Sequence, residues 1–244
     1  VFATTTTVTP TTYVDVYNSA ADGDVLLLDA GTYSTALNFP VAKTITLKKL
    51  DTAASTPVLT FSWTTTTVPT AGSGLILDGL EINLNNSYVM QLAANVVIDK
   101  LILKNCIISN VKRCIIRATS GGSDITEVTV DNCIVKDCGA DGWSLFYTRE
   151  IIRNLTFKNS TLYNYGGESI FLANTNAQTH TFTFNMQNNT IYKAGKDGAA
   201  FAWCNIPVAY ASTSTYNMSN NIFDTPFTTA DTRSAFIVLA NSGT

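Results

Sequence analysis

Hydrophobic and polar positions alternate over short stretches in the second half of the chain, and the alternation changes phase at an asparagine. Leu101–Ile108 shows the pattern clearly, with apolar residues alternating up to Asn105 and resuming after it. The repeated marker positions are Gly79, Asn105, Asn132, Asn159, Asn188 and Asn220. Their spacing of 26 to 32 residues is typical of a solenoid, in which each repeat forms one coil.

Within each repeat, the apolar positions predict three short strands separated by turns. Residues two before and three after a marker, such as Leu103 and Ile108, are apolar, so each flanking strand has one buried face. Asn and Gly both tolerate the left-handed backbone conformation of a sharp corner. A third apolar segment follows at 114–118, 144–148, 169–173, 200–204 and 235–239. The sequence therefore predicts an all-β, right-handed parallel β-helix of about seven coils.

The principal alternative is a leucine-rich repeat, which shares the period and an asparagine. In that repeat the asparagine comes three residues after the last strand leucine and a helical segment follows, whereas here it comes two residues after and the rest of the coil is strand-like. Thr12–Ala21 predicts a short helix that turns Val14, Val16 and Tyr17 inward and caps the first coil.

The expected organisation is one β-helix domain over residues 12–244, preceded by an N-terminal extension or linker at 1–11. The C-terminal part has no comparable capping pattern, which suggests truncation or an adjoining domain in the full-length protein. The chain opens without a methionine or signal peptide, so we expect any targeting segment to be absent from it.

Composition narrows the choice of partners. Charged residues make up 14% of the chain and the net charge is −3, so no basic field favours nucleic acid. No apolar run approaches the length of a transmembrane helix. The five cysteines include Cys106 and Cys133 at the same position of successive repeats. We expect free, buried thiols, with a disulfide between neighbouring coils as the alternative.

The opening segment Ala21–Tyr33, followed by Lys43–Leu47 and the asparagine-cornered coils, resembles the pectate-lyase-like right-handed β-helix superfamily. It is most similar to the chondroitinase B and alginate lyase branch, and it also resembles β-helix domains of unknown function in Bacteroidetes surface proteins. This resemblance implies an extracellular polysaccharide ligand, acidic or neutral, and a secreted or cell-surface location. It places the ligand along the sheet of third strands, beside the loops 109–113, 136–143, 163–168, 192–198 and 224–234.

This face contains residues suited to binding or cleaving an acidic sugar polymer. A uronate lyase needs a cation to neutralise the carboxylate and a base for the adjacent proton. The candidate catalytic residues are Lys112, Arg117 and Arg149. The candidate substrate-binding residues are Arg113, Arg117, Trp143, Tyr147, Arg149, Lys196 and Trp203. We expect Arg117, Tyr147 and Trp203 to share one register, with aromatic rings available to stack on sugars.

Asp141, Glu168 and Asp197 occur one per successive loop and are candidates for a Ca²⁺ site, although Asp-Gly pairs are also common in ordinary turns. The metal cluster expected of a chondroitinase B-like site is not recognisable, and the single histidine, His180, is expected away from the face. Three functions follow. The favoured one is a non-catalytic polysaccharide-binding module, the next is a polysaccharide lyase acting by β-elimination, and the last is a structural or adhesive spacer.

Overall fold

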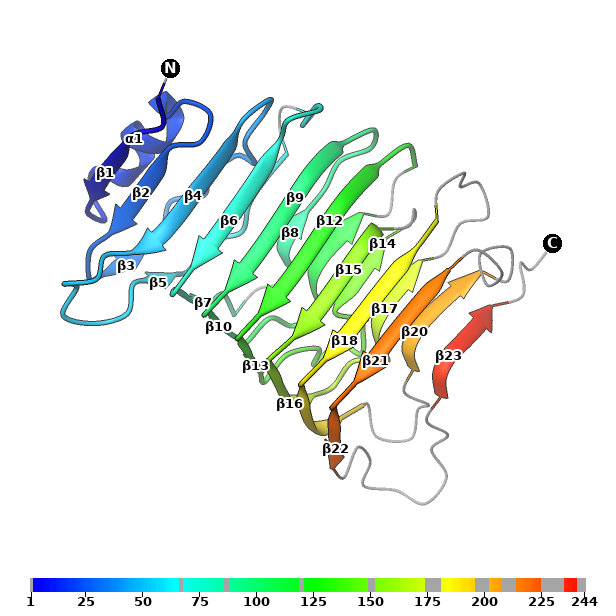
Figure 1. The fold of residues 1–244 in the computed structure, drawn as a ribbon. Coiled ribbons are helices and arrows are strands. Elements are labelled where there is room, and N and C mark those ends of the chain that lie inside the picture. Colours follow the sequence, from blue (N-terminus) through cyan, green and yellow to red (C-terminus); the bar gives the residue numbers. More distant parts are fainter. Residues whose placement is uncertain are drawn as a thin grey trace.

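The computed structural model describes residues 2–65, 68–85, 88–118, 121–148, 152–173, 181–195, 202–207, 214–224 and 235–240. Parallel strands from successive coils lie side by side and form three sheets around a common interior (Figure 1). Within the described part of the chain, the only helix is α1 (Tyr13–Ser19). The prediction of an all-β parallel β-helix with a short N-terminal helix is confirmed, and the leucine-rich repeat is excluded.

Each complete coil contributes one strand to each of the three sheets. The first sheet consists of β1 (Thr5–Val8), β2 (Val25–Leu28), β4 (Thr44–Lys49), β6 (Gly74–Asp78), β9 (Val97–Lys104), β12 (Asp124–Asp131), β15 (Ile152–Lys158), β18 (Thr183–Gln187) and β21 (Thr215–Ser219). The second consists of β3 (Thr32–Tyr33), β5 (Val58–Leu59), β7 (Glu81–Asn83), β10 (Ile107–Ser109), β13 (Ile134–Lys136), β16 (Thr161–Tyr165), β19 (Thr190–Ala194) and β22 (Ile222–Asp224). The third consists of β8 (Tyr88–Gln91), β11 (Cys114–Ala118), β14 (Phe146–Thr148), β17 (Ser169–Ala173), β20 (Ala202–Pro207) and β23 (Ala235–Ala240).

The third sheet has the fewest strands, so the number of coils in the described chain that contain a strand of every sheet is six. Two earlier coils have a regular strand on only two sides, where β2 precedes β3 and β4 precedes β5. The expected number of about seven coils therefore differs slightly from the structure. Residues 1–11, expected to be an extension or linker, include β1, which pairs in parallel with β2 and so belongs to the first sheet.

Asparagine markers form the corner between the first and second sheets. Their backbone φ angles lie between 52 and 55°, and Gly79 has a φ of 73°. These left-handed values confirm the predicted corner. A second corner lies at the ends of the second-sheet strands, where four residues also have positive φ: Asn110 and Asp137 directly after β10 and β13, and Asn164 and Lys193 one residue before the ends of β16 and β19. Because different residue types occupy this second corner, no single recurring residue marks it in the sequence.

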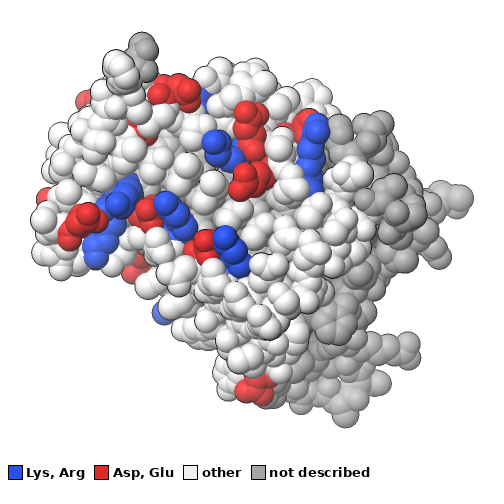
Figure 2. Space-filling view, viewed as in Figure 1, with Lys and Arg blue, Asp and Glu red and all other residues white. Residues whose placement is uncertain are grey.

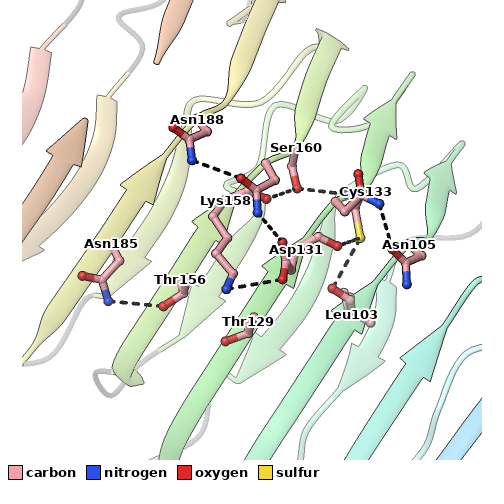
Figure 3. Close-up of polar contacts among 12 residues, drawn as sticks. Leu103, Asn105, Thr129, Asp131, Cys133, Thr156, Lys158, Ser160, Asn185 and Asn188 are labelled. Carbon is pink, nitrogen blue, oxygen red and sulfur yellow. Dashed lines mark hydrogen bonds and ion pairs between the residues drawn. The ribbon is translucent and has the colours of Figure 1, made fainter. Parts of the chain in front are cut away.

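A ladder of hydrogen bonds joins the residues that directly follow the asparagine markers. The Ser160 amide donates to Asn189 Oδ1 at 3.0 Å. The Cys133 amide donates to Ser160 Oγ at 3.0 Å (Figure 3). The Cys106 amide donates to Cys133 Sγ at 3.4 Å, continuing the ladder by one coil. All five cysteines are free and buried, which confirms the first of the two alternatives for the thiols.

Positive and negative side chains alternate from coil to coil near the C-terminal ends of the strands of the first sheet. The strand register aligns Lys48, Asp78, Lys104, Asp131 and Lys158 in five successive coils. Asp131 Oδ2 lies 3.3 Å from Lys158 Nζ, and Asp78 Oδ2 lies 3.2 Å from Lys104 Nζ. Acidic and basic side chains are accordingly interleaved on this face rather than gathered by sign (Figure 2).

Helix α1 lies at the N-terminal end of the stack (Figure 1). Tyr13 and Tyr17 are buried, whereas Val14 and Val16 are only partly buried against the core. The Tyr17 hydroxyl donates to the Asn38 carbonyl at 2.8 Å, and burial raises the pKa of this phenol. The inward position of Tyr17 is confirmed, while Tyr13 contributes more to the cap than the two valines do.

Candidate functional site

Arg117 and Tyr147 lie on the outer face of the third sheet. The register aligns Arg117 of β11 with Gln91 of β8 and with Tyr147 of β14. Their neighbours Ile116 and Phe146 are fully buried, as expected where successive side chains point to opposite faces of a strand. Arg117 and Tyr147 are both partly exposed.

Two guanidinium groups converge on the hydroxyl of Tyr88. Arg113 Nη1 donates to this oxygen at 2.8 Å, and Arg117 Nη1 donates to it at 2.7 Å. Tyr88 begins β8, one coil before the two arginines, and is only 8% exposed. The Tyr88 ring therefore forms the floor of the site, although nothing in the sequence pattern singled it out.

Trp143 lies next to both arginines and Tyr147. Its ring centroid is 5.1 Å from the Arg113 guanidinium carbon and 5.4 Å from that of Arg117. The Trp143 and Tyr147 rings meet edge to face with centroids 4.8 Å apart. These contacts combine cation–π and aromatic interactions, so Trp143 helps hold the two like charges close together.

Charge is only partly balanced within this group. Asp141 Oδ2 accepts a hydrogen bond from Arg113 Nε at 2.8 Å. That bond, followed by the one to Tyr88, raises the pKa of Arg113. None of the ion pairs formed among described residues includes Arg117, and its buried Nε has no hydrogen-bond partner. A buried donor without an acceptor is unusual in a folded protein.

We call these six residues the arginine–aromatic cluster: Tyr88, Arg113, Arg117, Asp141, Trp143 and Tyr147. Four of them, Arg113, Arg117, Trp143 and Tyr147, are among the predicted substrate-binding residues. The two arginines and one aspartate give the cluster one excess positive charge.

The acidic loop residues do not come together as a calcium site in the part of the chain that the structure describes. Asp141 is bonded to Arg113, and a guanidinium at that position opposes the approach of a cation. Glu168 is exposed on the following loop, and Asp197 lies outside the described residues. No group of three His, Cys, Asp or Glu side chains among the described residues could hold a metal ion. The residues present at Asp141 therefore do not fit Ca²⁺.

The expected register of Trp203 is wrong. Asn205 aligns with Leu172, which in turn aligns with Tyr147 and Arg117. Ser169, the first residue of β17, pairs with Ala202 and not with Ala200, so the expected alignment was displaced by two residues. The side chain of Trp203 lies outside the described residues, as do Arg149, Lys196 and His180. Lys112 is exposed beside Arg113, and its carbonyl accepts the Asp141 amide at 2.9 Å.

By its fold and by this cluster, the chain is a parallel β-helix domain with arginine and aromatic side chains gathered at its third sheet. The family model for DUF4957, a domain of unknown function, matches residues 31–165, more than half of the chain, and the chain belongs to that family. No curated protein matches the sequence.

Solved structures of the PL6 family alginate lyase AlyGC share the fold. The enzyme is 13% identical with a TM-score of 0.54, and a point mutant of it is 15% identical with a TM-score of 0.61. Both alignments cover 98% of this chain, which spans 40% and 39% of the lyase chains respectively. At this level of identity the likeness establishes the fold alone. Within the described residues, no helix has the length and hydropathy needed to cross a membrane.

Proposed function

We propose that this domain binds an acidic polysaccharide at the arginine–aromatic cluster without cleaving it. The observation that carries the proposal is Arg117, which is partly exposed and takes part in none of the ion pairs formed among the described residues. A carboxylate or sulfate on a sugar would accept charge-assisted hydrogen bonds from this guanidinium. The Trp143 and Tyr147 rings lie close enough to contact the apolar C–H face of the same or the next sugar.

The sheet geometry supports a polymeric ligand. Outward side chains of the third sheet recur at the strand spacing of about 4.8 Å, comparable to the length of one sugar unit, so neighbouring coils offer successive contacts to an extended chain. Alginate, the polysaccharide named for the structurally similar lyases, is a natural first ligand to test. A secreted or cell-surface location would give the domain access to such polymers.

The cluster also favours a second candidate, a polysaccharide lyase. The Tyr88 hydroxyl is a group able to transfer a proton, and the two guanidiniums that donate to it would also neutralise a substrate carboxylate. Cleavage of a uronic-acid polymer by β-elimination produces an unsaturated sugar that absorbs ultraviolet light. Binding without any rise in ultraviolet absorbance separates the first candidate from the second.

The test is affinity electrophoresis through gels containing alginate, pectate, chondroitin sulfate or neutral dextran. We expect the acidic polymers to retard the wild type and dextran to have little effect. Arg117→Gln should abolish most of the retardation. Arg153→Gln is a matched control, because Arg153 is paired with Asp124 on the first sheet, away from the cluster.

Three results would change the assignment. Equal mobility of wild type and Arg117→Gln in acidic gels would remove the cluster from the binding site. Wild-type mobility unaffected by every polymer would favour a structural or adhesive spacer. Ultraviolet-absorbing product formed by the wild type and lost in Arg117→Gln would replace binding with lyase activity.

A further inference from the structure

A buried tyrosine lies beneath the loop that presents Asp141 and Trp143. Tyr165 ends β16 and is 1% exposed, and burial raises its pKa well above the ordinary value. Its hydroxyl donates to the Trp143 carbonyl at 2.7 Å and to the Ser169 carbonyl at 2.9 Å. One hydroxyl hydrogen therefore links the loop of one coil to the start of β17 in the next.

The loop packs directly against this tyrosine because three surrounding positions are glycine. A Cβ on Gly167 would lie 2.1 Å from both the Trp143 carbonyl oxygen and the Tyr165 hydroxyl oxygen. A Cβ on Gly139 would lie 2.6 Å from the Tyr165 ring, and one on Gly166 would lie 3.0 Å from the Gly139 carbonyl. No other side chain could be inserted between the ring and the loop without displacing one of them.

Backbone hydrogen bonds fix the rest of the loop. The Gly139 amide donates to Val111 at 2.8 Å, the Asp141 amide donates to Lys112 at 2.9 Å, and the Gly142 amide donates to Gly139 at 2.8 Å. The first two bonds tie the loop to the residues just before Arg113. Among the described residues, Tyr165 is the only hydrogen-bond donor to the Trp143 carbonyl.

We propose that Tyr165 is a positioning residue for the arginine–aromatic cluster, setting the place of Trp143 relative to Arg113 and Arg117. The inference rests on the proposed function, since it concerns how that binding site is held. A loop fixed in its binding conformation avoids an ordering cost when ligand arrives. The Ser169 carbonyl also accepts the Leu145 amide at 3.0 Å, so removing the hydroxyl leaves the Trp143 carbonyl as the one short of a donor. The loop would then relax and Trp143 would lose its orientation.

The experiment compares Tyr165→Phe with Tyr33→Phe. Tyr33 is a matched control because it is also buried and its hydroxyl also bridges two carbonyls, those of Val8 at 3.1 Å and Asp29 at 2.9 Å, but in the N-terminal coils. Both variants should lower the midpoint of thermal unfolding by several degrees, about what one lost buried hydrogen bond produces. Only Tyr165→Phe should weaken binding to the acidic polysaccharide, by about tenfold.

A double-mutant cycle asks whether Tyr165 acts through Trp143. In a Trp143→Ala background, Tyr165→Phe should no longer change affinity. Gly167→Ala, which keeps the hydroxyl but pushes on the same carbonyl, should weaken binding in the same direction. It provides the test if Tyr165→Phe does not fold.

Near-ultraviolet circular dichroism gives a readout that needs no ligand. The band removed by Trp143→Phe identifies the Trp143 signal, and Tyr165→Phe should reduce that band while Tyr33→Phe leaves it intact. Unchanged affinity in Tyr165→Phe, or equal losses in both tyrosine variants, would overturn the inference. If the wild type binds no acidic polysaccharide, the proposed function fails, and an unchanged Trp143 band in Tyr165→Phe would then separately overturn the positioning role.

Discussion

Individual residues carried most of the predictable information about the fold. Asn132 and its equivalents were recognisable because few residue types tolerate the left-handed conformation of the corner. The same residue type therefore recurs at this position of successive repeats. Tyr88 had no such signature, since a tyrosine at the start of an apolar strand is compatible with an ordinary core position. The pairing of Arg113 with Asp141 was equally hidden, because it joins residues 28 positions apart whose meeting depends on two loop conformations.

The first prediction concerns the corner residue Asn132, which has a φ of 52° and donates through Nδ2 to Asn105 Oδ1 at 2.7 Å. Asn132→Ala should lower the free energy of unfolding by about 1–2 kcal/mol, because alanine is strained in the left-handed conformation. Asn132→Gly loses the same hydrogen bond without that strain and should cost less. Chemical denaturation of the two variants measures the difference, and an Ala variant as stable as the Gly variant would contradict the role of the φ angle.

At the scale of elements, strands were easier to predict than their connections. The bounds of β11 and β17 agree with the apolar segments at 114–118 and 169–173. These strands could be located because a short apolar run marks each one in the sequence. The alignment of β20 was displaced by two residues because loop length is not fixed by hydrophobic periodicity, and this displacement moved Trp203 out of the Arg117 register. The cluster lies where three coils and their loops meet, so errors in connections affect the site more than the fold.

The second prediction concerns the link between β1 and β2. Asp24 accepts hydrogen bonds from the Thr4 amide at 2.7 Å, the Ala21 amide at 2.8 Å and the Thr4 hydroxyl at 2.9 Å. The Thr4 amide bond, followed by the other two, lowers the pKa of this carboxyl in the folded protein. Its stabilising contribution is therefore fully present above the pKa of the unfolded carboxyl, about 4, and is lost as pH falls through the lower folded value.

Asp24→Asn provides the comparison, since the amide does not titrate in this range. The stability difference between wild type and variant should be constant near neutral pH and shrink below about pH 4. Hydrogen exchange of the β1 and β2 amides across this pH range locates the effect at the N-terminal end. A difference that grows on acidification would contradict the lowered pKa.

For the whole molecule, burial arises from stacking, because each coil covers the interior of its neighbours. The inward column three residues after the markers illustrates this: Leu162 and Ile191 are 0% and 1% exposed, whereas Phe223 in the last of these positions is 38% exposed. The same repeat position therefore buries different amounts of apolar surface in different coils. Sequence periodicity predicts which residues point inward, but the amount of surface buried depends on what lies above and below.

The third prediction follows from this gradient. Leu162→Ala should lower the free energy of unfolding by about 2–5 kcal/mol, as expected for a large-to-small change in a closed core. Phe223→Ala removes a larger side chain but should cost less, because much of its surface is already in contact with solvent and any space left by the ring is open to water. Paired denaturation curves test the ranking. A greater loss of stability in Phe223→Ala than in Leu162→Ala would mean that stability in this β-helix is not set by how completely neighbouring coils enclose each inward position.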